Sequence, residues 1–177
     1  LVLELPFAFS CRSAESFAQG GVRLLAATGL VSTLAFSVET PDLNWLQQVA
    51  RQKTAPQTQE RLQNALQEGL SYGAALGKAL GQTAATASSL ALPNNILALE
   101  YLSALSKYAP TLQALALPRQ GSEYHQETLP ASGYASATAL RQQLCLSSLQ
   151  DLSSFFPPVV WHRLLSSPRR PVTLRSL

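Results

Sequence analysis

Methionine is absent from the 177 residues of this sequence, and cysteine occurs only twice. A chain without methionine cannot begin at its own start codon, so we expect an internal piece of a longer protein. The two cysteines, Cys11 and Cys145, supply neither a disulfide framework nor a zinc-binding set, which favours a reducing, cytoplasmic setting. No apolar run reaches the roughly 18 residues that a membrane span requires. The sequence therefore predicts no membrane association.

Charged residues are also sparse, at 13% of the chain, whereas 46% of the residues are hydrophobic. That balance excludes a disordered chain and indicates enough apolar surface for an ordinary core. The net charge is +3, and residues 160–177 hold four arginines and no acid. Three of these are Arg163, Arg169 and Arg170, and a basic tail of this kind could meet phosphates. A solvated, poorly ordered terminus is the alternative.

Apolar runs of strand length alternate with stretches of helical spacing. Residues 1–5, 31–36 and 111–117 are short, apolar runs, and each predicts a strand. A helix that Ser13 caps lies between the first two runs, which predicts a βαβ unit with parallel strands. The sequence therefore predicts an α/β, Rossmann-like fold with a parallel sheet and additional helices.

Helices and loops fill the interval between the second and third strands. Asp42 is placed to cap the first of these helices. Residues 51–58 are polar and include a proline, and residues 82–91 are small and polar, so both predict loops. A longer loop is predicted over 118–135, and loops of that length are often functional. A helix that begins at Ser136 follows it.

Ser136, Thr138 and Arg141 lie together at the start of that last helix. In an open parallel sheet, ligands collect at the carboxyl ends of the strands, and a helix N-terminus attracts phosphate. Two hydroxyls, free amides and a guanidinium therefore predict a cradle for the phosphates of a nucleotide. A plain N-cap beside an exposed arginine is the alternative.

Asn94 and Asn95 permit two interpretations as well. The pair could cap a helix, or its amides could bind a ribose or the edge of an adenine. Arg119 follows the third strand, at the end of the sheet where a ligand would lie. His125 and His162 have no second ligand at metal-binding spacing, so the sequence predicts no metal site.

Four short segments follow one another along the chain. They are Leu3-Glu4-Leu5-Pro6-Phe7 with Ser13-Ala14-Glu15, Pro93-Asn94-Asn95-Ile96-Leu97 with Glu100-Tyr101, Arg119-Gln120-Gly121 with Tyr124-His125, and Ser136-Ala137-Thr138 with Arg141. In sequence and in order, they resemble segments of the bacterial tRNA(Met) cytidine acetate ligases. The resemblance implies a nucleotidyltransferase-like domain, of which residues 1–149 form part, and a helical region with a basic tail that starts within residues 150–177.

The resemblance also implies an activity. Members of this family activate acetate with ATP as acetyl-AMP and then acetylate N4 of the wobble cytidine of elongator tRNA(Met), and Mg²⁺ is expected to accompany ATP. By the same resemblance, ATP contacts are implied for Asn94 or Asn95 and for Arg119. Phosphate contacts are implied for Ser136, Thr138 and Arg141. For a protein that acts on tRNA, the basic tail with Arg163, Arg169 and Arg170 is a candidate for contacts with the RNA backbone.

The sequence departs from the family pattern in two places. The family carries an HxGH motif whose histidines stabilise charge on the transferred phosphoryl group, and this chain begins after that region. We therefore expect the first strand and helix of the domain to be missing, and no catalytic residue in this chain. Ser37 stands where the family has an ATP-contacting glycine, so a side chain here hinders close approach of the nucleotide.

Because of these departures, we expect the chain alone to adenylate acetate poorly. Two other functions remain open from the sequence. One is an adenylyltransferase with a small-molecule acceptor. The other is a non-catalytic remnant that binds nucleotide or RNA.

Overall fold

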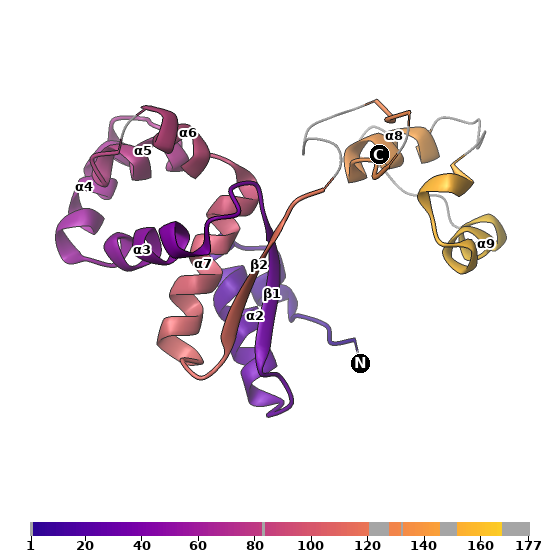
Figure 1. The fold of residues 1–177 in the computed structure, drawn as a ribbon, viewed down its shortest axis with the longest axis horizontal. Coiled ribbons are helices and arrows are strands. Elements are labelled where there is room, and N and C mark those ends of the chain that lie inside the picture. Colours follow the sequence, from indigo (N-terminus) through magenta and orange to yellow (C-terminus); the bar gives the residue numbers. More distant parts are fainter. Residues whose placement is uncertain (1, 83, 121–127, 132, 146–151, 168–177) are drawn as a thin grey trace. The chain divides into compact units, whose positions relative to one another are not determined.

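The computed structural model describes residues 2–82, 84–120, 128–131, 133–145 and 152–167. The chain divides into two units, residues 1–119 and 120–177, and each is described by itself. The first unit contains two parallel strands, β1 (Thr33–Val38) and β2 (Gln113–Pro118), whose register pairs Thr33 with Gln113 and Val38 with Pro118 (Figure 1). The predicted α/β class with a parallel sheet is confirmed.

Helices precede the first strand and fill the connection between the two strands. The helices before β1 are α1 (Phe7–Ser10) and α2 (Ala14–Ala27), and those after it are α3 (Leu43–Lys53), α4 (Pro56–Gln67), α5 (Tyr72–Ala79), α6 (Ala84–Leu90) and α7 (Pro93–Tyr108). Two predicted N-caps are confirmed, because the side chains of Ser13 and Asp42 accept hydrogen bonds from Ser16 N and Trp45 N.

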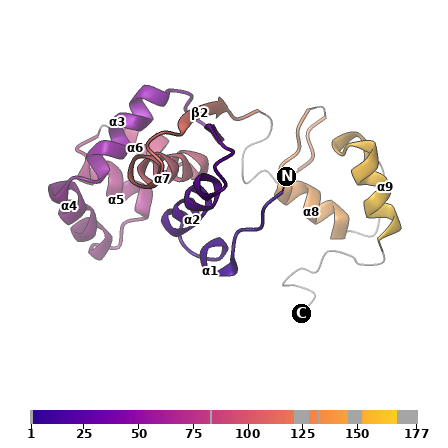
Figure 2. The same ribbon diagram turned by 90° about the horizontal axis from the view of Figure 1, so that it is seen from below.

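One face of the sheet is covered by α7, which contacts both strands and packs against α2 and α3 (Figures 1 and 2). Phe36 and Val38 of β1 are buried in a core that includes Leu46 of α3 and Leu99 of α7. A second cluster joins α2 to α7, with Val22 fully buried. The packing of α2 and α3 on α7 therefore holds the helical layer on that face.

The opposite face of the sheet is exposed and carries two leucines. Ala35 pairs in register with Leu115, and Ser37 pairs with Leu117, so these four side chains share one face. Leu115 and Leu117 are each 47% exposed.

The strand predicted over residues 1–5 is not observed. Residues 2–6 form neither helix nor strand, Val2 is 96% exposed, and the first element is α1. A strand exists only where a neighbour completes its hydrogen-bond ladder, and β1 pairs with β2. The predicted pairing of the first and second runs is therefore wrong, and the parallel pair arises from the second and third. The Phe9 ring of α1 instead packs where a Cβ on Gly20 would lie, 2.6 Å from Phe9 Cγ.

Two predicted loops are largely helical. Residues 51–58 contain only Thr54 and Ala55 between the ends of α3 and α4, and Pro56 starts α4 at a position that suits proline. Residues 82–91 contain α6. Alanine favours helices, and small residues let α6 approach α5 closely, since a Cβ on Gly77 would lie 2.6 Å from Ala87 Cβ.

The second unit contains α8 (Ala137–Cys145), the short 3₁₀ helix η1 (Ser153–Phe155) and α9 (Pro158–Ser166). The rings of Phe156 and Trp161 stack with their centroids 5.8 Å apart. The boundary predicted between residues 149 and 150 lies outside the described residues. Among the described helices, none combines the length and apolar character needed to cross a bilayer.

Candidate functional site

The carboxyl ends of β1 and β2 meet at one edge of the first unit. Beyond the strands, Arg119 N donates a hydrogen bond to Val38 O at 2.8 Å, which extends the ladder by one residue. Arg119 is half-buried. Val38 is the last residue of the neighbouring strand β1, and Glu39 follows it directly. The strand ladder therefore places Arg119 beside the chain that leaves β1.

Asn95 fastens the start of α7 to this edge. Its Oδ1 accepts hydrogen bonds from Glu39 N at 3.0 Å and Thr40 N at 3.1 Å. Its Nδ2 donates to Thr40 Oγ1 and to Ser89 O, both at 2.9 Å. Asn95 is fully buried, and these four bonds use the two acceptor and two donor positions of its amide. No hydrogen-bonding capacity remains on this side chain for a ligand.

The N-terminus of α7 is capped by Glu39 instead of by an asparagine. Leu92 occupies the N-cap position and has no polar side chain. Glu39 Oε1 accepts from Asn94 N at 3.2 Å and from Asn94 Nδ2 at 2.6 Å, and Oε2 accepts from Asn95 N at 2.9 Å. A carboxylate is stabilised there by free amides and by the positive end of the helix dipole. The interpretation of the asparagine pair as a cap is therefore wrong.

Glu39 is the residue of this edge that sequence reasoning missed. Its signal was an acidic residue immediately after a buried strand, together with a helix that starts at Pro93 without a capping side chain of its own. Ser37 is exposed on the other face of β1, away from the buried side chains of Phe36 and Val38. Its side chain therefore does not belong to the network around Glu39.

The second unit gathers the other predicted phosphate contacts at the start of α8. Ser136 Oγ accepts a hydrogen bond from Ala139 N at 3.0 Å, so Ser136 is the N-cap. Ser136 is only 2% exposed, Thr138 is half-buried and Arg141 is exposed. The structure thus brings Asn94, Asn95 and Arg119 together in the first unit, and Ser136, Thr138 and Arg141 together in the second.

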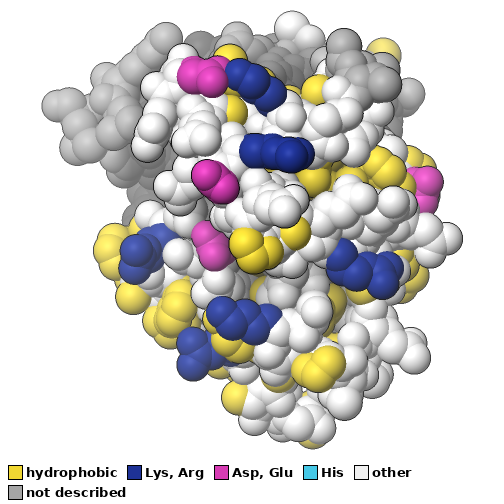
Figure 3. Space-filling view, turned by 90° about the vertical axis from the view of Figure 1, so that its left-hand side faces the viewer, with side chains coloured by type: hydrophobic (Ala, Val, Ile, Leu, Met, Phe, Trp, Pro, Cys, Tyr) yellow, Lys and Arg dark blue, Asp and Glu magenta, His cyan; other side chains and the backbone are white. Residues whose placement is uncertain are grey.

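The predicted RNA contacts are only partly within the described residues. Arg163 lies on α9 and is exposed. Arg169 and Arg170 lie outside the described residues, as does His125. On the face of the molecule in Figure 3, Lys and Arg side chains are separated by neutral, apolar and acidic ones. That face offers no continuous basic stripe.

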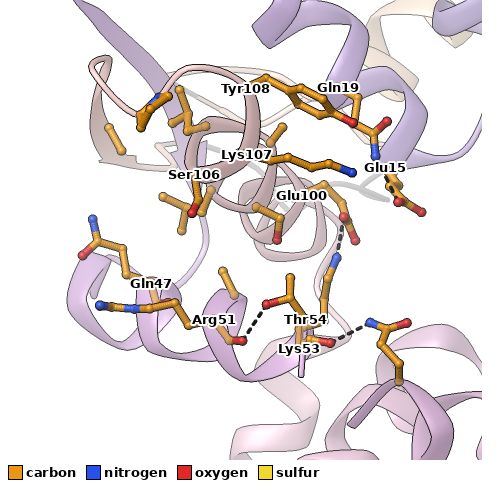
Figure 4. A pocket seen from close by; sticks show the side chains of 18 of the residues that line it. Glu15, Gln19, Gln47, Arg51, Lys53, Thr54, Glu100, Ser106, Lys107 and Tyr108 are labelled. Atoms are coloured by element: carbon orange, nitrogen blue, oxygen red, sulfur yellow. Dashed lines mark hydrogen bonds and ion pairs between the residues drawn. The ribbon is translucent and has the colours of Figure 1, made fainter. Parts of the chain in front are cut away.

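A groove of about 1160 Å³ lies elsewhere in the first unit, between α2, α3, α4 and the second half of α7 (Figure 4). On its wall, Lys53 Nζ is 2.5 Å from Glu100 Oε2, and these side chains are only 8% and 4% exposed. Tyr72 OH donates to Glu100 Oε1 at 3.0 Å. The groove contains none of the predicted site residues.

The Tyr72 phenol is held in its protonated form. Burial, and then the Glu100 carboxylate, raise the pKa of Tyr72 far above its ordinary value of 10.0. A protonated phenol and an ammonium together satisfy the buried carboxylate. This cluster therefore ties α3, α5 and α7 to one another.

A metal cluster is not found among the described residues, where no three His, Cys, Asp or Glu side chains converge. Glu39 is the acidic residue nearest the strand ends, and both of its oxygens already accept N–H groups. This edge therefore offers amides, a carboxylate that caps a helix, and a guanidinium, a set suited to a polar organic ligand more than to a bare cation.

Sequence comparison identifies relatives along almost the whole chain. The HIGH Nucleotidyl Transferase family matches residues 1–175. A tRNA(Met) cytidine acetate ligase of Syntrophomonas wolfei is 41% identical over 152 residues, which cover 81% of this chain and 36% of that protein. One from Caldicellulosiruptor saccharolyticus is 32% identical over 178 residues, which cover 98% and 44%. The chain spans less than half the length of these relatives.

Solved structures agree with the sequence comparison. Thermotoga maritima TmcAL in its apo form superposes with a TM-score of 0.84 at 28% identity, covering 96% of this chain and 43% of that one. The same protein bound to alpha-thio ATP superposes with a TM-score of 0.77 and covers 92% of this chain. The resemblance to the tRNA(Met) cytidine acetate ligases is confirmed. By its match over residues 1–175, the chain belongs to the HIGH nucleotidyl transferase family.

Proposed function

We propose that the protein containing this chain is an ATP-dependent ligase that acetylates N4 of the wobble cytidine of elongator tRNA(Met). The relatives carry this name, and TmcAL has been crystallised with an ATP analogue. The observation that carries the proposal in this chain is the polar edge at the carboxyl ends of two parallel strands, where Arg119 N bonds to Val38 O and the next residue, Glu39, bonds to the Asn94 amide. Nucleotides bind at such edges in open α/β sheets.

The reaction would proceed in two steps. In the first, an acetate oxygen attacks the α-phosphorus of ATP, the bond from that phosphorus to the bridging oxygen breaks, and pyrophosphate leaves. In the second, the cytidine N4 attacks the acetyl carbonyl, AMP leaves with the electron pair of the broken C–O bond, and N4 loses a proton. Positioning and charge stabilisation supply most of the catalysis in reactions of this kind.

The roles of this chain's residues follow from their chemistry. The guanidinium of Arg119 would pair with phosphate oxygens, and the Asn94 amide would bind the nucleoside. Ser136, Thr138 and Arg141 would contribute hydroxyl, amide and guanidinium donors to the phosphates. Asn95 would hold α7 in place without touching ATP, because its amide is saturated. Mg²⁺ would enter with the phosphates, since Glu39 is already occupied.

Contacts with tRNA are proposed for the arginines near the C-terminus. Arg163 is exposed on α9 and free to approach a phosphate backbone. Arg169 and Arg170 would extend the same basic segment. Each contact of this type contributes to affinity without reading sequence and makes binding salt-dependent.

The test is acetylation of elongator tRNA(Met) by the full protein that carries this chain. N4-acetylcytidine is measured by mass spectrometry after incubation with ATP and acetate, and a transcript with uridine at the wobble position is the matched control. We expect a product that requires ATP, acetate and the wobble cytidine. ATP-dependent adenylylation of a small acceptor other than acetate, with no N4-acetylcytidine formed, would contradict the proposal and favour an adenylyltransferase.

A further inference from the structure

We infer that Glu39 is a positioning residue that fixes the Asn94 side-chain amide in one orientation, so that Asn94 presents Oδ1 to the nucleoside part of ATP. The inference rests on the proposed function for its ligand. It assigns to Glu39 a contribution to nucleotide selectivity that is separate from its helix cap.

The orientation follows from the hydrogen bond between Asn94 Nδ2 and Glu39 Oε1, at 2.6 Å. An ionised carboxylate can only accept hydrogen bonds, so it must face the NH₂ end of the amide. Turning the amide over would set Asn94 Oδ1 against Glu39 Oε1, two acceptors in repulsive contact. Glu39 therefore selects one of the two ways in which this amide can lie.

Two hydrogen bonds with Asn95 fix the position of Glu39, one at its backbone and one at its carboxylate. Its backbone N donates to the buried Asn95 Oδ1 at 3.0 Å, and its second oxygen accepts from Asn95 N at 2.9 Å. The position of the carboxylate is thus set by the end of β1 and by the first turn of α7 together. A residue that could rotate freely would not define the orientation of a neighbouring amide.

The oriented amide selects the chemistry of its ligand. Within the described residues, no group donates a hydrogen bond to Asn94 Oδ1, and Asn94 is half-buried at the edge where Arg119 lies. An amide oxygen accepts hydrogen bonds, so the ligand must supply a donor there. On the nucleoside part of ATP, the donors are the exocyclic amino group of adenine and the ribose hydroxyls.

The first test examines the orientation without any nucleotide. In the ¹⁵N-labelled chain, we expect the two Asn94 side-chain amide protons to resonate far apart, because one is bonded to a carboxylate. Glu39→Gln should bring them together, whereas Glu68→Gln, at an exposed pair with Lys78, should leave them unchanged. Asn94 protons that Glu39→Gln does not move would overturn the assigned orientation.

The second test examines selectivity by equilibrium binding to the full protein that carries this chain. The probes are ATP, inosine triphosphate, which has a carbonyl in place of the adenine amino group, and 2′-deoxy-ATP and 3′-deoxy-ATP, which each lack one ribose hydroxyl. We expect ATP to bind about tenfold more tightly than one of these analogues, since the Asn94 Oδ1 acceptor would otherwise lose its donor. The analogue that shows the difference identifies the donor.

Glu39→Gln should reduce that ratio to about one, with the affinity for the poorer analogue unchanged. Asn94→Ala removes the oxygen and keeps Glu39, so it should also reduce the ratio of ATP to analogue affinity to about one. This variant keeps the test valid if Glu39→Gln misfolds. Equal weakening of all nucleotides by Glu39→Gln would show that Glu39 supports only the fold. Absence of ATP binding by the wild-type protein would overturn the proposed function, whatever the spectra show.

Discussion

Neighbouring asparagines at the start of α7 differ in what they can still offer a ligand. The Asn95 side chain uses both of its donor and both of its acceptor positions in hydrogen bonds within the protein, whereas the Asn94 side-chain oxygen still has capacity to accept a hydrogen bond. The difference decides which of the two residues is proposed to touch ATP. It also predicts that the two have different effects on stability.

Asn95→Ala should destabilise the first unit by about 2–4 kcal/mol, because it leaves buried N–H and C=O groups without partners. Asn94→Ala removes one side-chain bond to a half-buried carboxylate and should cost about 1 kcal/mol. Urea unfolding measures both, with the exposed Asn64→Ala as the matched control. A loss for Asn95→Ala no larger than that of Asn64→Ala would refute the structural role.

Tyr72 gives the stability a pH dependence on the alkaline side. Its pKa is raised in the folded state, so the folded chain holds the phenolic proton more tightly than the unfolded chain does. The resulting stabilisation is fully present below the ordinary pKa of 10.0 and is lost as the pH rises through it toward the folded value. We expect Tyr72→Phe to make the fall in unfolding free energy between about pH 9 and 11 shallower. An unchanged slope would contradict the assigned burial.

Sequence reasoning located these residues better than it explained them. An asparagine pair after a proline marks the start of a helix, and that inference was correct. Which asparagine is buried depends on Glu39, a residue 56 positions earlier in the sequence that is brought to α7 only by the fold. Local spacing carries no information about contacts of this separation.

The packing of α5 against α6 shows why small residues were misread at the element scale. The stretch over 82–91 has few large apolar side chains, so it predicted a loop, yet Leu90 is fully buried and the helix forms. The segments pack through close backbone approach and not through large side chains. At Gly73 and Gly77, there is no room for a Cβ beside the neighbouring segment. Periodicity of large residues is a weak guide to such an interface.

Gly73→Ala tests this close approach. A Cβ at Gly73 would lie 2.4 Å from Ala91 Cα, a backbone atom, so we expect a loss of about 1–3 kcal/mol. Gly21→Ala, in α2, meets nothing within 4 Å and should instead gain about 0.5–1 kcal/mol from helix propensity. Thermal unfolding distinguishes the two, and stabilisation by both substitutions would show that the helices are not in close contact.

At the scale of the whole molecule, the error over residues 1–5 has its physical origin in strand pairing. A parallel strand is stable only beside a partner, so an apolar run such as residues 1–5 can be read correctly as strand-like and still form no strand. The α/β fold class and the parallel direction of the strands could be predicted from the sequence, because both depend on the order of the apolar runs and the helices along the chain. Which runs pair depends on the rest of the sheet.

The expected activity of the chain by itself also belongs to the scale of the whole molecule. The 177 residues contain no HxGH segment, and their two histidines are His125 and His162. We expect the chain alone to show no acetate-dependent exchange of pyrophosphate into ATP above the blank, because the HxGH histidines that would stabilise charge on the transferred phosphoryl group are not among its residues. Robust exchange by the purified chain would contradict this expectation.

ATP binding at the strand edge is the central claim, and the affinity of the Arg119→Ala variant tests it most directly. Dissociation constants for ATP are measured on the full protein that carries this chain, with the exposed Arg61→Ala as the control. The account predicts that Arg119→Ala weakens binding at least about tenfold, the loss of a charge-assisted pair, while Arg61→Ala binds as the wild type does. Equal affinities for all three proteins, or no binding by any of them, would contradict it.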